Sequence, residues 1–121
     1  MFAELAFAVA LIQQSPPQSY SAGPHTWTAV HTAGQLPWKT PPGIQYPDQA
    51  RDRDIYRGDV TIGCEVRLDT GRLENCRVLA ETPEGVGFGR RAVVGLGQSY
   101  LDTTRWSEPL VAVRVGFVGN F

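Results

Sequence analysis

The two cysteines, Cys64 and Cys76, are the residues whose type and spacing most directly suggest chemistry. Two thiols in one domain form a disulfide, remain as small buried apolar side chains, or contribute to a metal site. A tetrahedral metal site needs four ligands, and no histidine lies near either cysteine in the sequence. A metal site is therefore the weakest of these three interpretations.

A glycine-rich segment, Gly85-x-Gly87-x-Gly89, precedes the pair Arg90-Arg91 and superficially suggests a phosphate-binding turn. Its spacing is not the G-x-G-x-x-G of dinucleotide-binding folds, and it carries no P-loop lysine. The more ordinary interpretation is a flexible turn that lets Phe88 anchor a helix on a sheet. We expect no nucleotide site here.

No set of residues with catalytic spacing is apparent. His25 and His31 lack a cysteine or carboxylate at a metal-ligand spacing. The serines and threonines form no nucleophile elbow and no Ser/His/Asp signature. We therefore expect no catalytic residues, no metal and no cofactor, and a protein that is not an enzyme.

The composition is that of an ordinary globular chain of 121 residues, with 42% apolar and 19% charged residues. The net charge is −1, and the acidic and basic residues are interspersed without a basic stripe. Nucleic acid is therefore not an expected partner.

The N-terminal segment Phe2–Ile12 is apolar apart from Glu4. It is shorter than the roughly 20 residues that span a bilayer, but it has the length of a signal-peptide core. The first basic residue is Lys39, so the basic start of a signal peptide is missing. A signal, the end of a longer anchor that begins upstream, and a short buried helix all remain open.

The chain divides by composition into three segments. Residues 1–22 are signal-like or a truncated anchor, residues 23–45 form a proline-rich linker, and residues 46–121 form the folded domain. The segment His25–Thr32 offers at most one short strand within the linker. Proline, glycine and hydrophobic periodicity in the domain predict a helix in Asp48–Tyr56, a strand in Val60–Leu68, a return strand in Arg72–Glu81, a helix from Phe88 to Gln98, and a last strand in Leu110–Val118.

The first two strands should form a hairpin, because Asp69-Thr70-Gly71 fits a three-residue turn closed by a glycine. Strict alternation then gives a register that places Leu68 opposite Arg72, Val66 opposite Glu74, Cys64 opposite Cys76, Ile62 opposite Val78 and Val60 opposite Ala80. We therefore predict a Cys64–Cys76 disulfide. Closing a loop of this size stabilises the fold by about 3 kcal/mol at most in the chain-entropy model, and the gain should be smaller here because the hairpin already restricts the loop. Two reduced cysteines in the core are the alternative.

The order and spacing of these motifs resemble the C-terminal domain of the TonB family of energy transducers. The resemblance covers residues 46–121. It is carried by Tyr46-Pro47-x-x-Ala50, Arg57-Gly58-x-Val60, Val66, the turn at Gly71, the strand with Val78, Pro83 and Phe88 before the second helix, and the final valine-rich strand. Arg105-Trp106-x-x-Pro109 matches only in outline, because the family has an aromatic residue where this chain has Ser107 and Glu108. A cysteine in each hairpin strand resembles one variant of the family.

The resemblance implies an α+β fold of three antiparallel strands with two helices on one face, in the order helix–strand–strand–helix–strand. It implies that the last strand is an edge, which in that family pairs with the TonB box, an extended peptide of outer-membrane transporters. The partner-binding residues carried over are Gln45, Tyr46 and Pro47, together with Leu110, Val111, Ala112, Val113, Arg114, Val115, Gly116 and Phe117.

The expected protein is thus a periplasmic interaction module, soluble or anchored at the inner membrane if its N-terminus is incomplete. Contact with inner-membrane motor proteins is not expected of the chain as written, because its apolar run is short and its proline-rich segment is limited. A second copy of the chain is a further candidate partner. The alternative function is a small secreted structural or inhibitory protein of the same fold, without a transporter partner.

Overall fold

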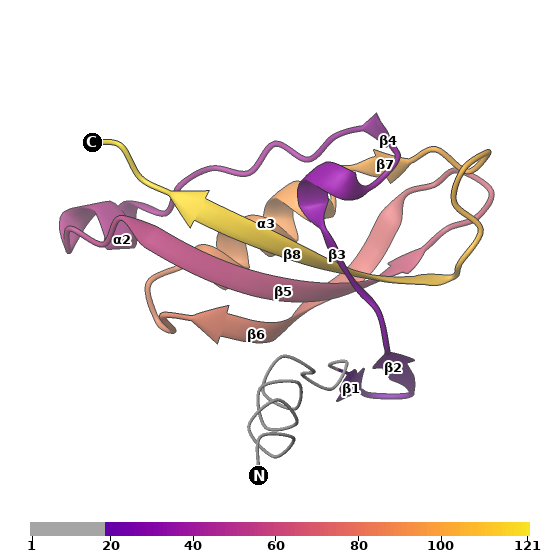
Figure 1. Cartoon of the computed structure of the whole chain (residues 1–121), viewed down its shortest axis with the longest axis horizontal. Helices are drawn as coiled ribbons and strands as arrows, with labels where there is room; N and C mark the ends of the chain where they lie inside the picture. Colours follow the sequence, from indigo (N-terminus) through magenta and orange to yellow (C-terminus); the bar gives the residue numbers. More distant parts are fainter. Residues whose placement is uncertain (1–18) are drawn as a thin grey trace, which may run out of the picture.

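The computed structural model describes residues 19–121, and the signal-like segment predicted for residues 1–22 lies largely outside them. The helices and strands follow one another along a mixed α and β chain, which Figure 1 shows. They are β1 (Tyr20–Ala22), β2 (His25–Trp27), β3 (Val30–Thr32), the 3-10 helix η1 (Ala33–Gln35), β4 (Trp38–Thr40), α2 (Asp48–Asp52), β5 (Arg57–Val66), β6 (Leu73–Thr82), α3 (Phe88–Leu96), β7 (Tyr100–Leu101) and β8 (Leu110–Val118).

The main sheet has four strands in the order β3-β8-β5-β6, with β8 and β5 at its centre. β5 runs antiparallel to both β6 and β8, as the sequence predicts for the strands of the domain. The expected three-stranded sheet is wrong in one respect. β3 adds a fourth strand parallel to β8, and it comes from the segment that the composition assigns to the linker.

The hairpin of β5 and β6 differs from the predicted register. Val66 pairs with Leu73, because Leu68 joins the turn instead of the strand and leaves the turn one residue longer than expected. Gly71 closes that turn with a φ of 86°, which favours glycine there, as the motif predicts. Ile62 does lie opposite Val78 as predicted. Between Glu74 and Arg77, β6 contains one more residue than β5 has on the opposite side, and this extra residue compensates for the longer turn.

The predicted disulfide between Cys64 and Cys76 is confirmed. Cys64 lies between the pairs Gly63–Arg77 and Glu65–Glu74, so two residues of β6, Asn75 and Cys76, face this one residue of β5. Asn75 adopts a φ of 50°, the local cost of that bulge. The Cα atoms of the two half-cystines are 4.1 Å apart. The bulge therefore brings the sulfur atoms together although the strict register is wrong.

The two helices contribute to one hydrophobic core. On α3, the predicted stripe of Phe88, Ala92 and Leu96 is fully buried and packs against the sheet. On α2, Ala50 is buried, but the helix ends at Asp52, short of the predicted Tyr56, since Asp54 has a φ of 56°. The sheet supplies the other half of the core, from alternate residues of β5 and β8.

The predicted linker, residues 23–45, contains four short elements and two buried side chains. Trp27 is 3% exposed, and Leu36 also lies in the core. β1 and β2 form an antiparallel pair of their own, and β4 pairs with β7. Part of the segment therefore pairs with strands of the domain, and Figure 1 shows β4 beside β7 and β3 crossing near β8.

Candidate functional site

β8 holds the predicted partner-binding residues Leu110 to Phe117, and its two faces differ in chemistry. The residues Val111, Val113, Val115 and Phe117 are buried against the helices. On the opposite face Arg114 and Gly116 are exposed. At Arg114 and Gly116 this second face of β8 is open to solvent.

Hydrogen bonds at both ends of β8 fix which backbone groups point away from β5. At one end the N–H of Gly119 donates to the carbonyl oxygen of Tyr56 at 2.7 Å. At the other end the N–H of Val66 donates to the carbonyl oxygen of Pro109 at 2.8 Å. In an antiparallel pair the residues that face the partner strand alternate with those that face away. The groups that point away from β5 therefore belong to Leu110, Ala112, Arg114, Gly116 and Val118.

β3 covers one part of this edge and leaves another part without a strand. Its register pairs Val30 with Ala112, His31 with Val113 and Thr32 with Arg114. Within residues 19–121, the residues Gly116 and Val118 have no strand on that side. The expectation that the whole last strand is an edge is thus wrong for its middle, because three residues of the predicted linker pair with it.

The predicted approach segment, Gln45 to Pro47, lies only partly beside β8. The Tyr46 ring lies 6.1 Å from the ring of Phe117, between ring centroids, and its hydroxyl donates to the carbonyl oxygen of Ile55. Gln45 instead accepts a hydrogen bond from Arg91 at 3.2 Å. Pro47 precedes α2. Of the three, Tyr46 is the residue with a ring contact to the candidate edge.

An exposed aromatic surface lies at the C-terminal end of β8. Tyr56 and Phe121 stack with their ring centroids 5.1 Å apart, and each is about half exposed. Val118 beside them is 71% exposed. The guanidinium of Arg51 lies 5.6 Å from the centroid of the Phe121 ring. This surface leaves no signal in the sequence, since its members come from two segments far apart in the chain, residues 51–56 and 118–121.

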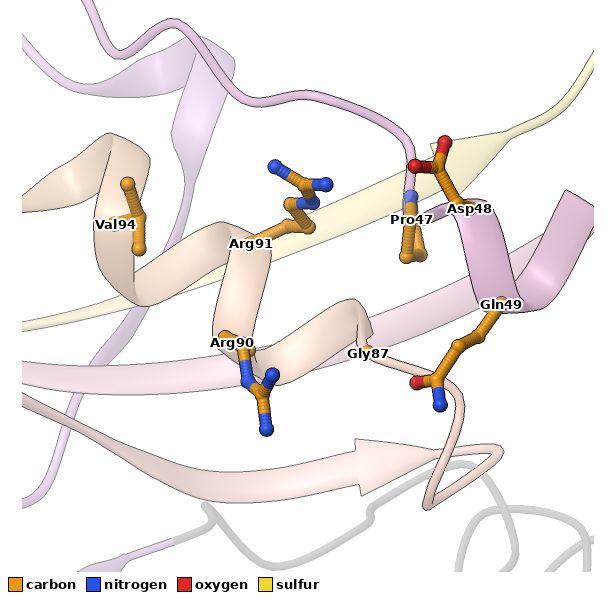
Figure 2. A pocket seen from close by; sticks show the side chains of 7 residues that line it. All are labelled: Pro47, Asp48, Gln49, Gly87, Arg90, Arg91 and Val94. Carbon is orange, nitrogen blue, oxygen red and sulfur yellow. The ribbon is translucent and has the colours of Figure 1, made fainter.

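The glycine-rich turn and the first turn of α3 border a cavity of about 180 Å³, shown in Figure 2. Arg90 and Arg91 project from α3 to different sides in this view. The N–H of Gly89 already donates to the Glu81 carboxylate at 2.9 Å. The chain's own carboxylate thus satisfies a donor that a phosphate would use.

The face of the sheet opposite the helices carries the ion pair of Arg114 with Asp59 and a contact between His25 and Glu65. Arg114 donates to both carboxylate oxygens of Asp59, at 3.1 Å to Oδ1 and 2.6 Å to Oδ2, and this contact raises the pKa of Arg114. His25 lies 3.0 Å from Glu65. The pKa of Glu65 is lowered, first because the Asn75 amide donates to it and then because of the His25 ring.

The two histidines do not meet one another in a site. His25 contacts Glu65, whereas His31 packs edge-on against Trp106 with ring centroids 5.2 Å apart. In the part of the chain that the structure describes, no group of three or more metal-ligating side chains occurs. No helix within those residues is long and apolar enough to cross a membrane.

Comparison with protein-family models finds no match for this chain, and comparison with curated proteins finds none either. The geometry of β8 is therefore the main guide to function. The segment His25–Thr32, for which the sequence allowed at most one short strand, contains two, β2 and β3. Nothing in the sequence indicated that β3 pairs with β8 or that Trp27 is buried, because strands of three residues are too short to be distinguished from an irregular linker.

Proposed function

We propose that this chain is a non-catalytic interaction module that binds an extended peptide by adding it as a strand to the edge of β8. The observation that carries the proposal is the pair of residues Gly116 and Val118. Their backbone groups point away from β5 and have no strand beside them within residues 19–121. Such groups are a template for another strand.

The partner in this proposal is the peptide of an outer-membrane transporter, of the TonB-box type. The motif order in residues 46–121 supports this choice, as does the Cys64–Cys76 disulfide, which is typical of oxidising compartments such as the periplasm. The exposed rings of Tyr56 and Phe121 would contribute apolar contact area beside the added strand. Energy-coupled transport is the process that such binding would serve.

Two substitutions at Gly116 test the proposal. Gly116→Pro removes the N–H that points away from β5 and should leave the bonds between β8 and β5 in place. Gly116→Ala keeps that N–H, and a Cβ atom at this position meets nothing within 4 Å. One net hydrogen bond is worth about 0.5–1.5 kcal/mol, so we expect Gly116→Pro to weaken peptide binding by roughly three- to tenfold. Gly116→Ala should bind as the unmodified chain does.

The measurement is a titration with synthetic peptides from the N-terminal segments of outer-membrane transporters, followed by the backbone amide resonances of the chain. Shifts centred on Gly116 and Val118 are expected. If no peptide binds, or if the shifts lie on α3 and β6 instead, the proposal is wrong. Sedimentation of the chain alone tests whether a second copy pairs at the same edge.

A small secreted structural or inhibitory protein is the second candidate function. The coverage of Ala112 and Arg114 by β3 favours it, because a partly protected edge is what a protein without a strand partner would need. The same titration separates the two candidates, since this second function predicts no binding by any transporter peptide.

A further inference from the structure

We propose that β3 is a displaceable strand that competes for the docking edge of β8 within the same chain. This inference rests on the proposed function and adds a means of regulating it. The segment concerned is named the strap, residues 28–35, which contains β3 and η1. The strap leaves β8 when an incoming peptide pairs along the full edge.

The arrangement of backbone groups on β8 gives the reason. The backbone groups of five residues, Leu110, Ala112, Arg114, Gly116 and Val118, point away from β5, and β3 covers those of Ala112 and Arg114. A peptide that uses only Gly116 and Val118 gains very few ladder hydrogen bonds, and each contributes little on balance. Pairing along the whole strand needs the positions that β3 occupies.

The strap is held less firmly than the chain on either side of it. None of residues 28–35 is buried, and Thr32 is exposed. Near the C-terminal end of the strap, the indole N–H of Trp38 donates to the carbonyl oxygen of Ala33 at 2.7 Å. The flanking residues Trp27 and Leu36 are both buried, and the indole N–H of Trp27 donates to the carbonyl oxygen of Cys64 at 3.2 Å. The strap therefore has an anchor at each end and can leave β8 as a loop while the anchors stay in place.

Side chains add little to the pairing of β3 with β8. His31 packs on the half-buried Trp106. Arg114, which lies opposite Thr32, makes its ion pair with Asp59 of β5 and not with the strap. The pairing of the strap with β8 is favoured chiefly by proximity, because a strand tethered to the same chain has a high effective concentration at its own site.

Amide exchange of the unmodified full chain gives the first test. The N–H groups of Ala112 and Arg114 face β3, whereas the N–H of Val113 faces β5 and lies inside the sheet. If the strap opens by itself, Ala112 and Arg114 should exchange at least tenfold faster than Val113. Equal protection of the three amides would overturn the inference, and this measurement needs no variant.

A matched pair of proline variants gives the second test. His31 lies between Ala112 and Arg114 in the parallel register, so His31→Pro removes an N–H that faces β8. Thr32 has a φ of −65°, which suits proline, and alternation turns its N–H away from β8, so Thr32→Pro is the control. The probe is the synthetic peptide Thr-Ala-Val-His-Thr-Ala-Gly, which repeats residues 28–34.

We expect the labelled probe to bind the His31→Pro chain at least tenfold more tightly than the unmodified chain or Thr32→Pro. Equal affinity for all three chains would overturn the inference. Transporter peptides that bind the unmodified chain and His31→Pro equally would also overturn it, while the proposed function would stand. Conversely, if the probe behaves as expected but no transporter peptide binds any variant, the proposed function fails and the displaceable strand remains.

Discussion

The indole ring of Trp27 lies directly over Gly63, on the face of the sheet opposite the helices. A Cβ atom on Gly63 would stand 2.8 Å from Cε2 of this ring and 2.8 Å from Cδ1 of Leu79. Real Cβ atoms do not approach so closely. Trp27 can therefore pack against this face of the sheet because Gly63 has no side chain.

We predict that Gly63→Ala destabilises the fold by about 1–3 kcal/mol, because the added methyl group displaces Trp27 or Leu79. Urea unfolding measures the loss, and the tryptophan emission of the folded variant should shift to longer wavelength as the indole meets water. Gly116→Ala in β8 is the matched control, since its Cβ meets nothing within 4 Å. A stability equal to that of the control would contradict the close contact.

Reduction of the Cys64–Cys76 bond should lower the free energy of unfolding by about 2–3 kcal/mol in the chain-entropy model. Urea unfolding with and without a thiol reductant measures this difference. The Cys76→Ser variant should match the reduced chain, because Cys76 is only partly buried and its loss leaves no large cavity. An unchanged unfolding midpoint on reduction would show that the bond restricts the unfolded chain very little.

The contact of β2 with Glu65 should depend on pH. The pKa of Glu65 lies below its ordinary value of 4.5, chiefly because of the Asn75 amide and then because of His25. The stabilisation is therefore fully present above about pH 4.5 and is lost as the pH falls through the lower pKa of the folded state. Chemical shifts of the Glu65 carboxyl and the Trp27 indole N–H, followed in an acid titration, measure this. In Glu65→Gln the indole resonance should not respond over the same range.

Phe88 is the residue on which the helix–sheet contact most depends. Its side chain is 0% exposed, and its ring packs 4.8 Å from that of Phe117, between centroids. Phe88→Ala should cost about 3–5 kcal/mol, measured by urea unfolding. Val94→Ala, on the same helix but 55% exposed, serves as the control and should change stability by less than about 0.5 kcal/mol. Similar losses in both variants would argue against this packing.

The elements in which apolar residues recur at a regular spacing could be predicted from the sequence. Val111, Val113, Val115 and Phe117 place a bulky apolar residue at every second position, and the structure contains a strand with the predicted bounds, Leu110–Val118. Phe88, Ala92 and Leu96 likewise predict the buried face of α3 correctly. In both cases one side of the element faces the core over its full length, so the pattern is complete in the sequence.

The register of the hairpin could not be obtained in the same way. Strict alternation assumes one residue of β6 for each residue of β5, whereas β6 contains extra residues near Asn75 and Leu79. A bulge leaves only a weak signature in a single sequence. Asparagine is disfavoured in strands and tolerates the positive φ of Asn75, but one such residue does not fix the position of a bulge, and Leu79 gives no sign of one. The disulfide was still predicted correctly, since the longer turn and the first bulge offset one another at Cys64.

The strand β8 of the candidate site could be predicted from the sequence, but the pairing of β3 along part of its edge could not. Local pattern gave β8, yet the pairing of Val30–Thr32 with it depends on contacts between segments about 80 positions apart. Prolines on both sides of this stretch favour an irregular chain. The burial of the Trp27 and Leu36 side chains outweighs that preference. Tertiary packing, not local preference, therefore decides where β3 lies.

The position of the turn Asp69–Gly71 determines whether proteolysis there separates the chain into two molecules. The turn lies between the two half-cystines, inside the covalent ring that their bond closes. A protease that cuts at the exposed Thr70 would thus produce two fragments that stay joined through sulfur. The protein would continue as a two-chain molecule, and its halves would separate on a gel only after the cystine had been reduced.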